Sequence, residues 1–270
     1  HPKLVDALKE QGEKLWHLSN LYFTPQSSYL AQKLVDNSFA DKVFFTNSGA
    51  ESIECGLKIG RSYQHGINRP ERYRIMTFKG AFHGRTFASC SANDPKKFSP
   101  FLTPYVDWFE NVDLNINSVK ESINKNIGII LIEPVQGEGG INVIDYDFLK
   151  DLRLICDEND LLLFFDCVQC GIGRTGKFFA YEHSDIYPDI CAIAKGLGGG
   201  FPLGACLSTE RVSKFIGPGM HGSTCGGNPL AAHIGLAVIN EILKPGFLDN
   251  VLLVGNYLKN KLDLLSNRFN

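Results

Sequence analysis

Two charged residues, Lys195 and Asp166, each directly follow an apolar run, where a charged group is unfavourable unless it has a partner of opposite charge or hydrogen-bond donors. Lys195 follows the apolar run 190–194 and precedes a glycine-rich run. Apolar surroundings favour the nucleophilic amine form of a lysine, and glycines let the backbone approach a ligand closely. Asp166 follows the apolar run 161–165, where a carboxylate needs a cation such as a protonated pyridine nitrogen. The plain alternatives are a lysine that extends to solvent and an aspartate that caps a turn.

The segment 47–51 is typical of a phosphate site. Its sequence, Asn-Ser-Gly-Ala-Glu, lies between an expected strand and an expected helix. Small residues at a helix N-terminus leave backbone N–H groups free, and with the helix dipole these groups attract an anion. Capping of the helix by Ser48 is the commoner role for such a serine, so this segment alone does not decide the matter.

Two further segments place polar groups beside glycines. Phe82 and Arg85 flank a His-Gly pair, and the fork of an arginine suits a carboxylate while a phenylalanine offers a flat face to a ring. Ser223 and Thr224 supply two hydroxyls in a loop that ends at a helix start, 228–229. Taken singly, these segments also fit a surface arginine beside a core phenylalanine and an ordinary loop with a cap.

The elements that must position these groups alternate along the chain. We expect strands at 43–45, 73–78, 127–132, 161–165, 190–194 and 203–207, helices at 50–63, 146–159, 228–243 and 248–265, and a helical stripe from Leu4 to Leu18. Strands that alternate with helices predict an α/β fold with a mostly parallel sheet flanked by helices. Ligand sites in such sheets collect at the carboxyl ends of the strands, where the segments above fall.

Composition narrows the class of protein. The chain has 270 residues, a net charge of −2 and no apolar run long enough to cross a bilayer, so we expect neither a nucleic-acid binder nor a membrane protein. The start, His-Pro-Lys, has no features of a signal peptide. Eight cysteines at irregular spacing do not form a disulfide-scaffold pattern, and a reducing cytoplasm is the expected location.

Two motifs suggest other chemistry. Residues 171–176 satisfy G-x-G-x-x-G, but four residues separate them from Asp166 and no convincing helix follows, so NAD binding is disfavoured. Cys167 and Cys170 form C-x-x-C, yet only His183 is close enough in sequence to complete a zinc site. We therefore expect no metal.

Together, and in this order, the segments resemble the class III aminotransferases, which are pyridoxal-phosphate enzymes of fold type I. The resemblance is carried by TNSGAES, GAFHGRT, EPVQGEGG, FFDCVQCGIGRTGKFFAYE, AKGLGGGFPLGA and HGSTCGGNPLA. It covers essentially the whole chain, although members of the family are longer at both ends. It implies a cofactor-binding large domain at 1–245 and, at 246–270, a helix leading toward a C-terminal small domain.

The resemblance also implies how pyridoxal 5'-phosphate is held. Lys195 forms the Schiff base and later moves the substrate proton, Asp166 pairs with the pyridine nitrogen, and Gln169 bonds the 3-oxygen. Phe82 stacks on the ring. The phosphate is expected to be bound by Ser48, Gly49, Ala50 and, from the neighbouring subunit of a homodimer with shared active sites, Thr224.

Substrate roles follow from the same resemblance. Arg85, with Ser223 beside it, is expected to hold the carboxylate of the amino donor, and Glu138 matches a glutamate that gates a C-terminal arginine with no counterpart in this chain. Cys167 replaces a glutamate usual in the family, which changes the charge beside Asp166.

The resemblance, in details such as HGRT and EGG, implies N2-acetylornithine as donor and 2-oxoglutarate as acceptor, in arginine biosynthesis. Ornithine, succinylornithine and succinyl-diaminopimelate remain alternative donors. A glutamate-semialdehyde aminomutase and a shortened cofactor-binding chain with little turnover also remain open.

Overall fold

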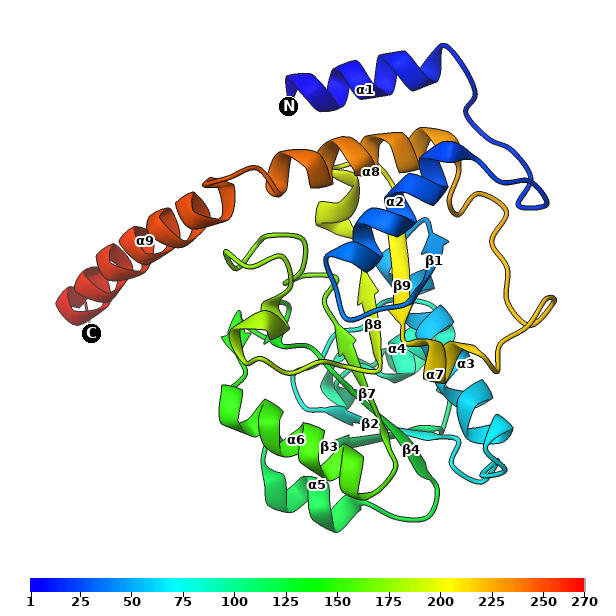
Figure 1. The fold of residues 1–270 in the computed structure, drawn as a ribbon. Coiled ribbons are helices and arrows are strands. Elements are labelled where there is room, and N and C mark those ends of the chain that lie inside the picture. Colours follow the sequence, from blue (N-terminus) through cyan, green and yellow to red (C-terminus); the bar gives the residue numbers. More distant parts are fainter. Residues whose placement is uncertain (270) are drawn as a thin grey trace.

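A seven-stranded sheet forms the centre of the computed structural model, which describes residues 1–269 (Figure 1). Its strands, in spatial order, are β1 (Lys42–Thr46), β9 (Gly204–Ser208), β8 (Ile190–Ile193), β7 (Leu162–Asp166), β4 (Ile127–Ile132), β2 (Arg74–Phe78) and β3 (Phe109–Val112). Neighbours run parallel except at β9, which is antiparallel to both β1 and β8. The predicted α/β class with a mostly parallel sheet is confirmed. A separate pair, β5 (Val135–Gln136) and β6 (Asn142–Val143), lies outside this sheet.

Helices cover both faces of the sheet. They are α1 (Pro2–Gly12), α2 (Pro25–Asp36), α3 (Gly49–Gly66), α4 (Phe87–Ser91), α5 (Ile116–Ser122), α6 (Tyr146–Glu158), α7 (Glu210–Ser213), α8 (Pro229–Ile242) and α9 (Phe247–Phe269). One hydrophobic core joins α2, α5, α6 and α8 to one face, and a second core joins α3 to the other. The chain's most apolar segments are therefore enclosed between two layers.

The central strands explain why their sequences are apolar throughout. Successive side chains of a strand point to opposite faces, so a strand between two helical layers needs apolar residues at every position. In β7, Phe165 belongs to the core under α6 and α8, while Phe164 belongs to the core under α3. Burial of each such side chain stabilises the fold by roughly 1.5–3 kcal/mol.

Close approach of α3 to the sheet depends on glycine. A Cβ atom at Gly56 would overlap the ring of Phe164, and one at Gly60 would lie 2.5 Å from Cδ1 of Ile129. Because α3 presses directly on the sheet, its N-terminus is fixed relative to the ends of β7 and β8.

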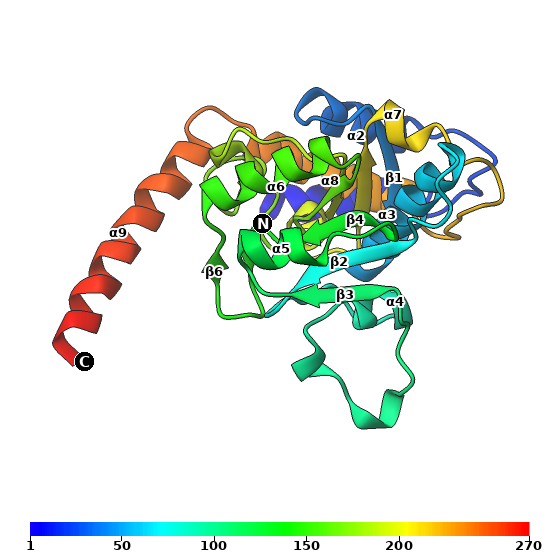
Figure 2. The same ribbon diagram turned by 90° about the horizontal axis from the view of Figure 1, so that it is seen from below.

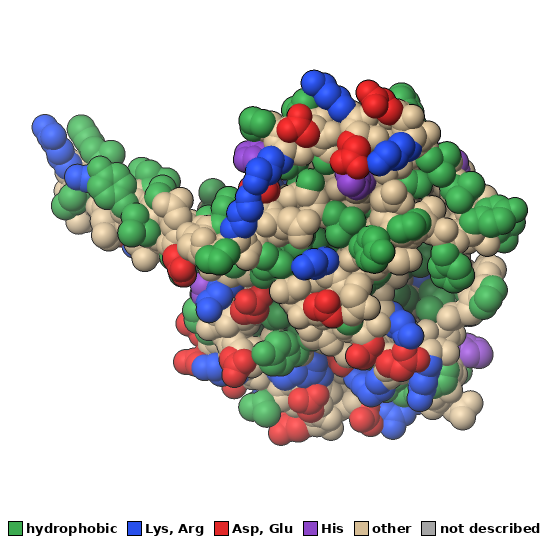
Figure 3. Space-filling view, turned by 45° about the horizontal axis from the view of Figure 1, so that its top comes forward, with side chains coloured by type: hydrophobic (Ala, Val, Ile, Leu, Met, Phe, Trp, Pro, Cys, Tyr) green, Lys and Arg blue, Asp and Glu red, His purple; other side chains and the backbone are tan. Residues whose placement is uncertain are grey.

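The last helix, α9, extends away from the rest of the molecule (Figures 1 and 2). None of its described residues is buried. Figure 3 shows hydrophobic side chains over the surface of this projecting helix. The division at residue 245 into a domain and a following helix stays a prediction.

The helical stripe expected from Leu4 to Leu18 is too long. Helix α1 ends at Gly12, whose carbonyl accepts a hydrogen bond of 2.6 Å from Nε1 of Trp16. This side chain replaces the next backbone donor, so Leu15 and Leu18 lie in a loop. Among the described helices, none is long and apolar enough to span a membrane.

Candidate active site

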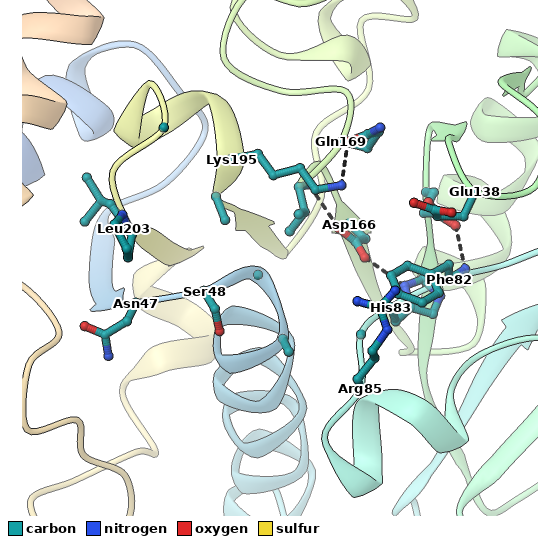
Figure 4. A pocket seen from close by; sticks show the side chains of 18 of the residues that line it. Asn47, Ser48, Phe82, His83, Arg85, Glu138, Asp166, Gln169, Lys195 and Leu203 are labelled. Atoms are coloured by element: carbon teal, nitrogen blue, oxygen red, sulfur yellow. Dashed lines mark hydrogen bonds and ion pairs between the residues drawn. The ribbon is translucent and has the colours of Figure 1, made fainter. Parts of the chain in front are cut away.

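A cavity of about 400 Å³ opens at the carboxyl ends of the parallel strands (Figure 4). Nine of the eleven residues that the sequence predicts for the site line it: Ser48, Gly49, Ala50, Phe82, Arg85, Glu138, Asp166, Gln169 and Lys195. They come from five segments that are far apart in sequence. The strand-end rule therefore correctly located this side of the sheet.

Lys195 lies just after β8, at the start of a short 3-10 helix, Lys195–Gly198. Its φ of 41° falls in the left-handed region, which is unfavourable for a residue other than glycine and is kept only where surrounding structure enforces it. Its Nζ donates a hydrogen bond of 2.6 Å to Oε1 of Gln169. The ammonium group is thus aimed into the cavity toward β7 (Figure 4).

Asp166 is the last residue of β7 and only 3% exposed. Its Oδ2 lies 2.8 Å from Nδ1 of His83, and its Oδ1 accepts a hydrogen bond of 3.0 Å from the backbone N–H of Val168. These contacts satisfy the buried carboxylate from two sides and fix its orientation. The carboxylate can therefore present a fixed negative group to a cation bound in the cavity.

The N-terminus of α3 forms a polar cradle at one end of the cavity. Ser48 caps the helix by accepting a hydrogen bond of 3.3 Å from the N–H of Glu51, so the capping interpretation of the serine holds. The backbone N–H groups of Gly49 and Ala50 belong to the first turn, where a helix offers no carbonyl partner. A Cβ atom at Gly49 would lie 2.7 Å from Val168, so the glycine permits this close packing.

Arg85 and Phe82 form the opposite wall. The Arg85 guanidinium lies 5.1 Å from the centre of the Phe82 ring, a cation–π distance. Within residues 1–269, Arg85 forms no ion pair with a carboxylate. Its exposed guanidinium is therefore available to an anionic ligand. Glu138 lies in the loop between β5 and β6 and is exposed at the cavity mouth.

The sequence prediction assigned no role to Glu133. This residue follows β4, is 4% exposed and accepts a hydrogen bond of 2.9 Å from the backbone N–H of Phe82. Burial raises the pKa of Glu133 to about 7, and nearby Asp166 adds to the increase while His83 opposes it. Its position directly after the apolar strand β4, like that of Asp166 at the end of β7, is the sequence signal for this residue.

The loop that precedes α8 stands apart from the cavity. Ser223 Oγ accepts a hydrogen bond of 3.2 Å from Asn47, and its carbonyl accepts one of 2.6 Å from Asn20. Neither Ser223 nor Thr224 lines the cavity formed by the described part of this chain. The structure thus does not bring Ser223 beside Arg85.

The two competing motifs occupy a compact set of turns. Residues 168–179 contain no α-helix, so the G-x-G-x-x-G segment has no helix N-terminus with which to bind a pyrophosphate. Cys167 and Cys170 carry free thiols, and burial contributes to a pKa well above the usual value for both. Cys167 therefore adds no charge beside Asp166.

A family model described as "Aminotransferase class-III" matches residues 1–270. The acetylornithine aminotransferase of Agrobacterium fabrum is 50% identical over 270 residues, covering all of this chain and 68% of the relative. That of Aquifex aeolicus is 48% identical over 264 residues, covering 97% of this chain and 69% of the relative.

Solved structures of aminotransferases also superpose on this chain. N-acetylornithine aminotransferase from Stenotrophomonas maltophilia superposes with a TM-score of 0.84 at 34% identity, covering 100% of this chain and 66% of that one. An ornithine aminotransferase from Toxoplasma gondii, with partial occupancy of PLP at its active site, superposes with a TM-score of 0.92 at 28% identity, covering 97% and 63%. The chain thus spans about two thirds of the length of the proteins it matches.

Proposed function

Since this chain belongs to the class III aminotransferases, we propose that it is the cofactor-binding part of an enzyme that moves the terminal amino group of N2-acetylornithine to 2-oxoglutarate. This would be a step of arginine synthesis. The observation that carries the proposal is a single cavity in which the Lys195 amine, the buried Asp166 carboxylate and the free N–H groups of α3 converge. The names of the relatives support the choice of donor.

The residues present fit pyridoxal phosphate. Gly49 and Ala50 would bind its phosphate through backbone N–H groups at a helix N-terminus. Asp166 would pair with the pyridine nitrogen, Gln169 with the 3-oxygen, and the Phe82 ring would lie against the ring face. When bound, the cofactor supplies an electron sink for the negative charge that develops on the substrate carbon.

Lys195 would have two roles in this reaction. Its Nζ would bind the cofactor aldehyde carbon and, once the donor's amine has taken its place, carry the proton removed from the donor carbon. The hydrogen bond to Gln169 and the constrained backbone hold that nitrogen at one position in the cavity. Asp166, kept in place by His83, would stabilise positive charge on the ring nitrogen throughout.

Reductive trapping tests this proposal directly. Borohydride should fix the pyridoxyl group on Lys195 of the cofactor-loaded chain and block tryptic cleavage there. A labelled peptide 178–211 should then replace peptides 178–195 and 196–211. Label on another lysine, or no label, would contradict the proposal.

A panel of acetylornithine, ornithine, succinylornithine and succinyl-diaminopimelate with 2-oxoglutarate then identifies the donor. Glutamate semialdehyde tests the aminomutase alternative, because its isomerisation needs no 2-oxoglutarate. Label on Lys195 without turnover would indicate a cofactor-binding chain with little activity of its own.

Arg85 gives a test of substrate binding. The Arg85→Lys variant keeps the positive charge but loses the two-pronged contact with a carboxylate, so the KM for the amino donor should rise roughly tenfold. Steady-state kinetics measure this, with cofactor absorbance as the control for an intact site. An unchanged KM would remove Arg85 from the donor site.

We also propose that the active unit is a homodimer, as the family resemblance implies. Thr224 and Ser223 lie outside this chain's own cavity, in keeping with a role in the partner's site. Mixing inactive Lys195→Ala and Thr224→Ala chains should restore part of the activity if sites are shared. The eight free thiols agree with the cytoplasmic location that we propose.

A further inference from the structure

A second cavity, of about 490 Å³, lies between α3, β9 and the loop that follows α7. Cys55 of α3 and Cys206 of β9 both line it, together with His221. The two cysteines also belong to the core beneath α3, and they are 0% and 1% exposed. Both residues are therefore covered in this structure, and the cavity is the side from which a small reagent would approach them.

Two basic groups stand beside these thiols. Lys58 lies one helical turn after Cys55, and its Nζ is 3.1 Å from Nδ1 of His221. Because an ammonium group can only donate, Nδ1 accepts, and the proton of a neutral His221 ring is on Nε2. The ring is held at 4.8 Å from that of Phe44. His221 is thus a fixed hydrogen-bond donor at the wall that carries Cys55.

Their contacts change the pKa values of the two thiols in opposite directions. A hydrogen bond from Cys206, together with His221 and Lys58, lowers the pKa of Cys55 to about 6 against the opposing effect of burial. The same hydrogen bond and burial raise the pKa of Cys206 well above its usual value. A thiolate next to a protonated thiol is the arrangement found in reactive dithiol pairs.

We propose that Cys55 and Cys206 form an oxidisable dithiol at which a hydroperoxide closes a disulfide between α3 and β9. The Cys55 thiolate attacks one oxygen of hydrogen peroxide, the O–O bond breaks, and hydroxide leaves with a proton as water. The Cys206 sulfur then attacks the sulfenic sulfur of Cys55, and its proton leaves with the departing hydroxyl as a second water. Two electrons pass from the thiols to the peroxide.

The same chain contains a matched comparison. Cys167 lies next to both Cys170 and Cys191, but burial contributes to a raised pKa for all three, and none of them lines either cavity described here. With no cation to stabilise a thiolate, this cluster should remain reduced under conditions that oxidise the first pair.

Peptide mapping of the full chain treated with hydrogen peroxide at pH 7 tests the proposal. Trypsin releases Cys55 in peptide 43–58 and Cys206 in peptide 196–211, each the sole cysteine of its peptide. We expect these two peptides to become linked before peptide 154–174, which holds Cys167 and Cys170, forms an internal bond. Dithiothreitol should separate them. Absence of this link while other cysteines oxidise would overturn the proposal.

Variants test whether Lys58 and His221 promote the oxidation of Cys55. Lys58→Met and His221→Phe should each raise the pKa of Cys55 and so slow formation of the disulfide. The rate should fall roughly threefold for each unit by which this pKa exceeds the assay pH. The fall is less than tenfold because the smaller thiolate fraction is partly offset by the greater nucleophilicity of the remaining thiolate. Cys225→Ser, which removes an exposed cysteine elsewhere, should leave the rate unchanged. Equal rates in all variants would show that the basic groups play no part and would contradict the mechanism.

Discussion

Among single residues, Glu133 has a carboxyl whose charge is unfavourable in the fold. It is buried beside a second carboxyl, Asp166, and its oxygens accept backbone N–H groups of Phe82 and Gly137. Each of these neighbours belongs to a segment that carries a candidate site residue. Glu133 therefore ties the Phe82 wall to the loop of Glu138, although its own charge is penalised.

This penalty predicts a pH-dependent stability. The pKa of Glu133 is raised from 4.5 to about 7 in the folded chain, so between these values the folded state holds a proton that the unfolded state has lost. The free energy of unfolding should fall as pH rises through this window, by up to about 3 kcal/mol, and then level off. Urea unfolding of cofactor-free Glu133→Gln, which cannot ionise, should lack this component.

Subtracting the Glu133→Gln curve from that of the unaltered chain isolates the effect of this carboxyl from that of other groups. Parallel curves between pH 4.5 and pH 8 would show that the buried carboxyl titrates normally.

Sequence reasoning succeeded at residues whose type has few possible partners. Lys195 and Asp166 were predicted because each follows an apolar strand, where a charge demands an explanation. In the structure Asp166 is buried, whereas Lys195 is exposed to the cavity and lacks the apolar surroundings that its sequence suggested. His83 was present in a recognised motif, yet its bond to Asp166 joins residues 83 positions apart and leaves no local pattern. The left-handed backbone of Lys195 was also beyond prediction, because a lysine has no intrinsic preference for it.

Among the elements, α3 is the helix on which both the polar cradle of the cavity and the proposed dithiol depend. We expect Gly56→Ala to destabilise the chain by about 1–3 kcal/mol, because the fully buried ring of Phe164 cannot move away from the added methyl group. This loss should exceed the gain of about 1 kcal/mol in helix propensity.

Gly255→Ala in α9 provides the matched control for Gly56→Ala. No atom lies within 4 Å of the added methyl at Gly255, so only the propensity gain should appear. Denaturant midpoints measure both variants. A Gly56→Ala chain as stable as the control would show that α3 can shift off the sheet.

Element boundaries were predictable where pattern and burial coincide. The expected strand 127–132 agrees with β4 residue for residue, since both faces are buried. Helix α2 was missed although Thr24 and Pro25 form a cap and first-turn signature, because its apolar residues are few. Edge strand β3 was missed for a related reason: it pairs with β2 alone and carries a charged residue.

On the scale of the full chain, α9 adds no buried residue to the core within its described part. Leu248 and Leu252 contact the positions of Gly173 and Gly176, but Leu258, Leu262 and Leu265 are each at least 50% exposed along one side of the helix. Truncation after residue 255 should change the free energy of unfolding by less than about 0.5 kcal/mol. It should also weaken concentration-dependent association, because an exposed apolar stripe is removed.

Sedimentation velocity over a concentration series, with urea unfolding of both chains, measures the effect of the truncation. A loss of stability well above 1 kcal/mol would show that the outer part of α9 packs on the body in solution.

The reversed strand β9 also has a consequence for how the chain is made. Within residues 1–269, β1 pairs only with β9, whose residues follow it by about 160 positions. At roughly 5–20 residues per second, the ribosome needs on the order of 10–30 s to supply that partner. During this time the apolar segment Val43–Phe45 has an unpaired backbone edge that can join a neighbouring nascent chain. Holding chaperones should therefore raise the yield of this protein most when they bind before the last third of the chain is synthesised.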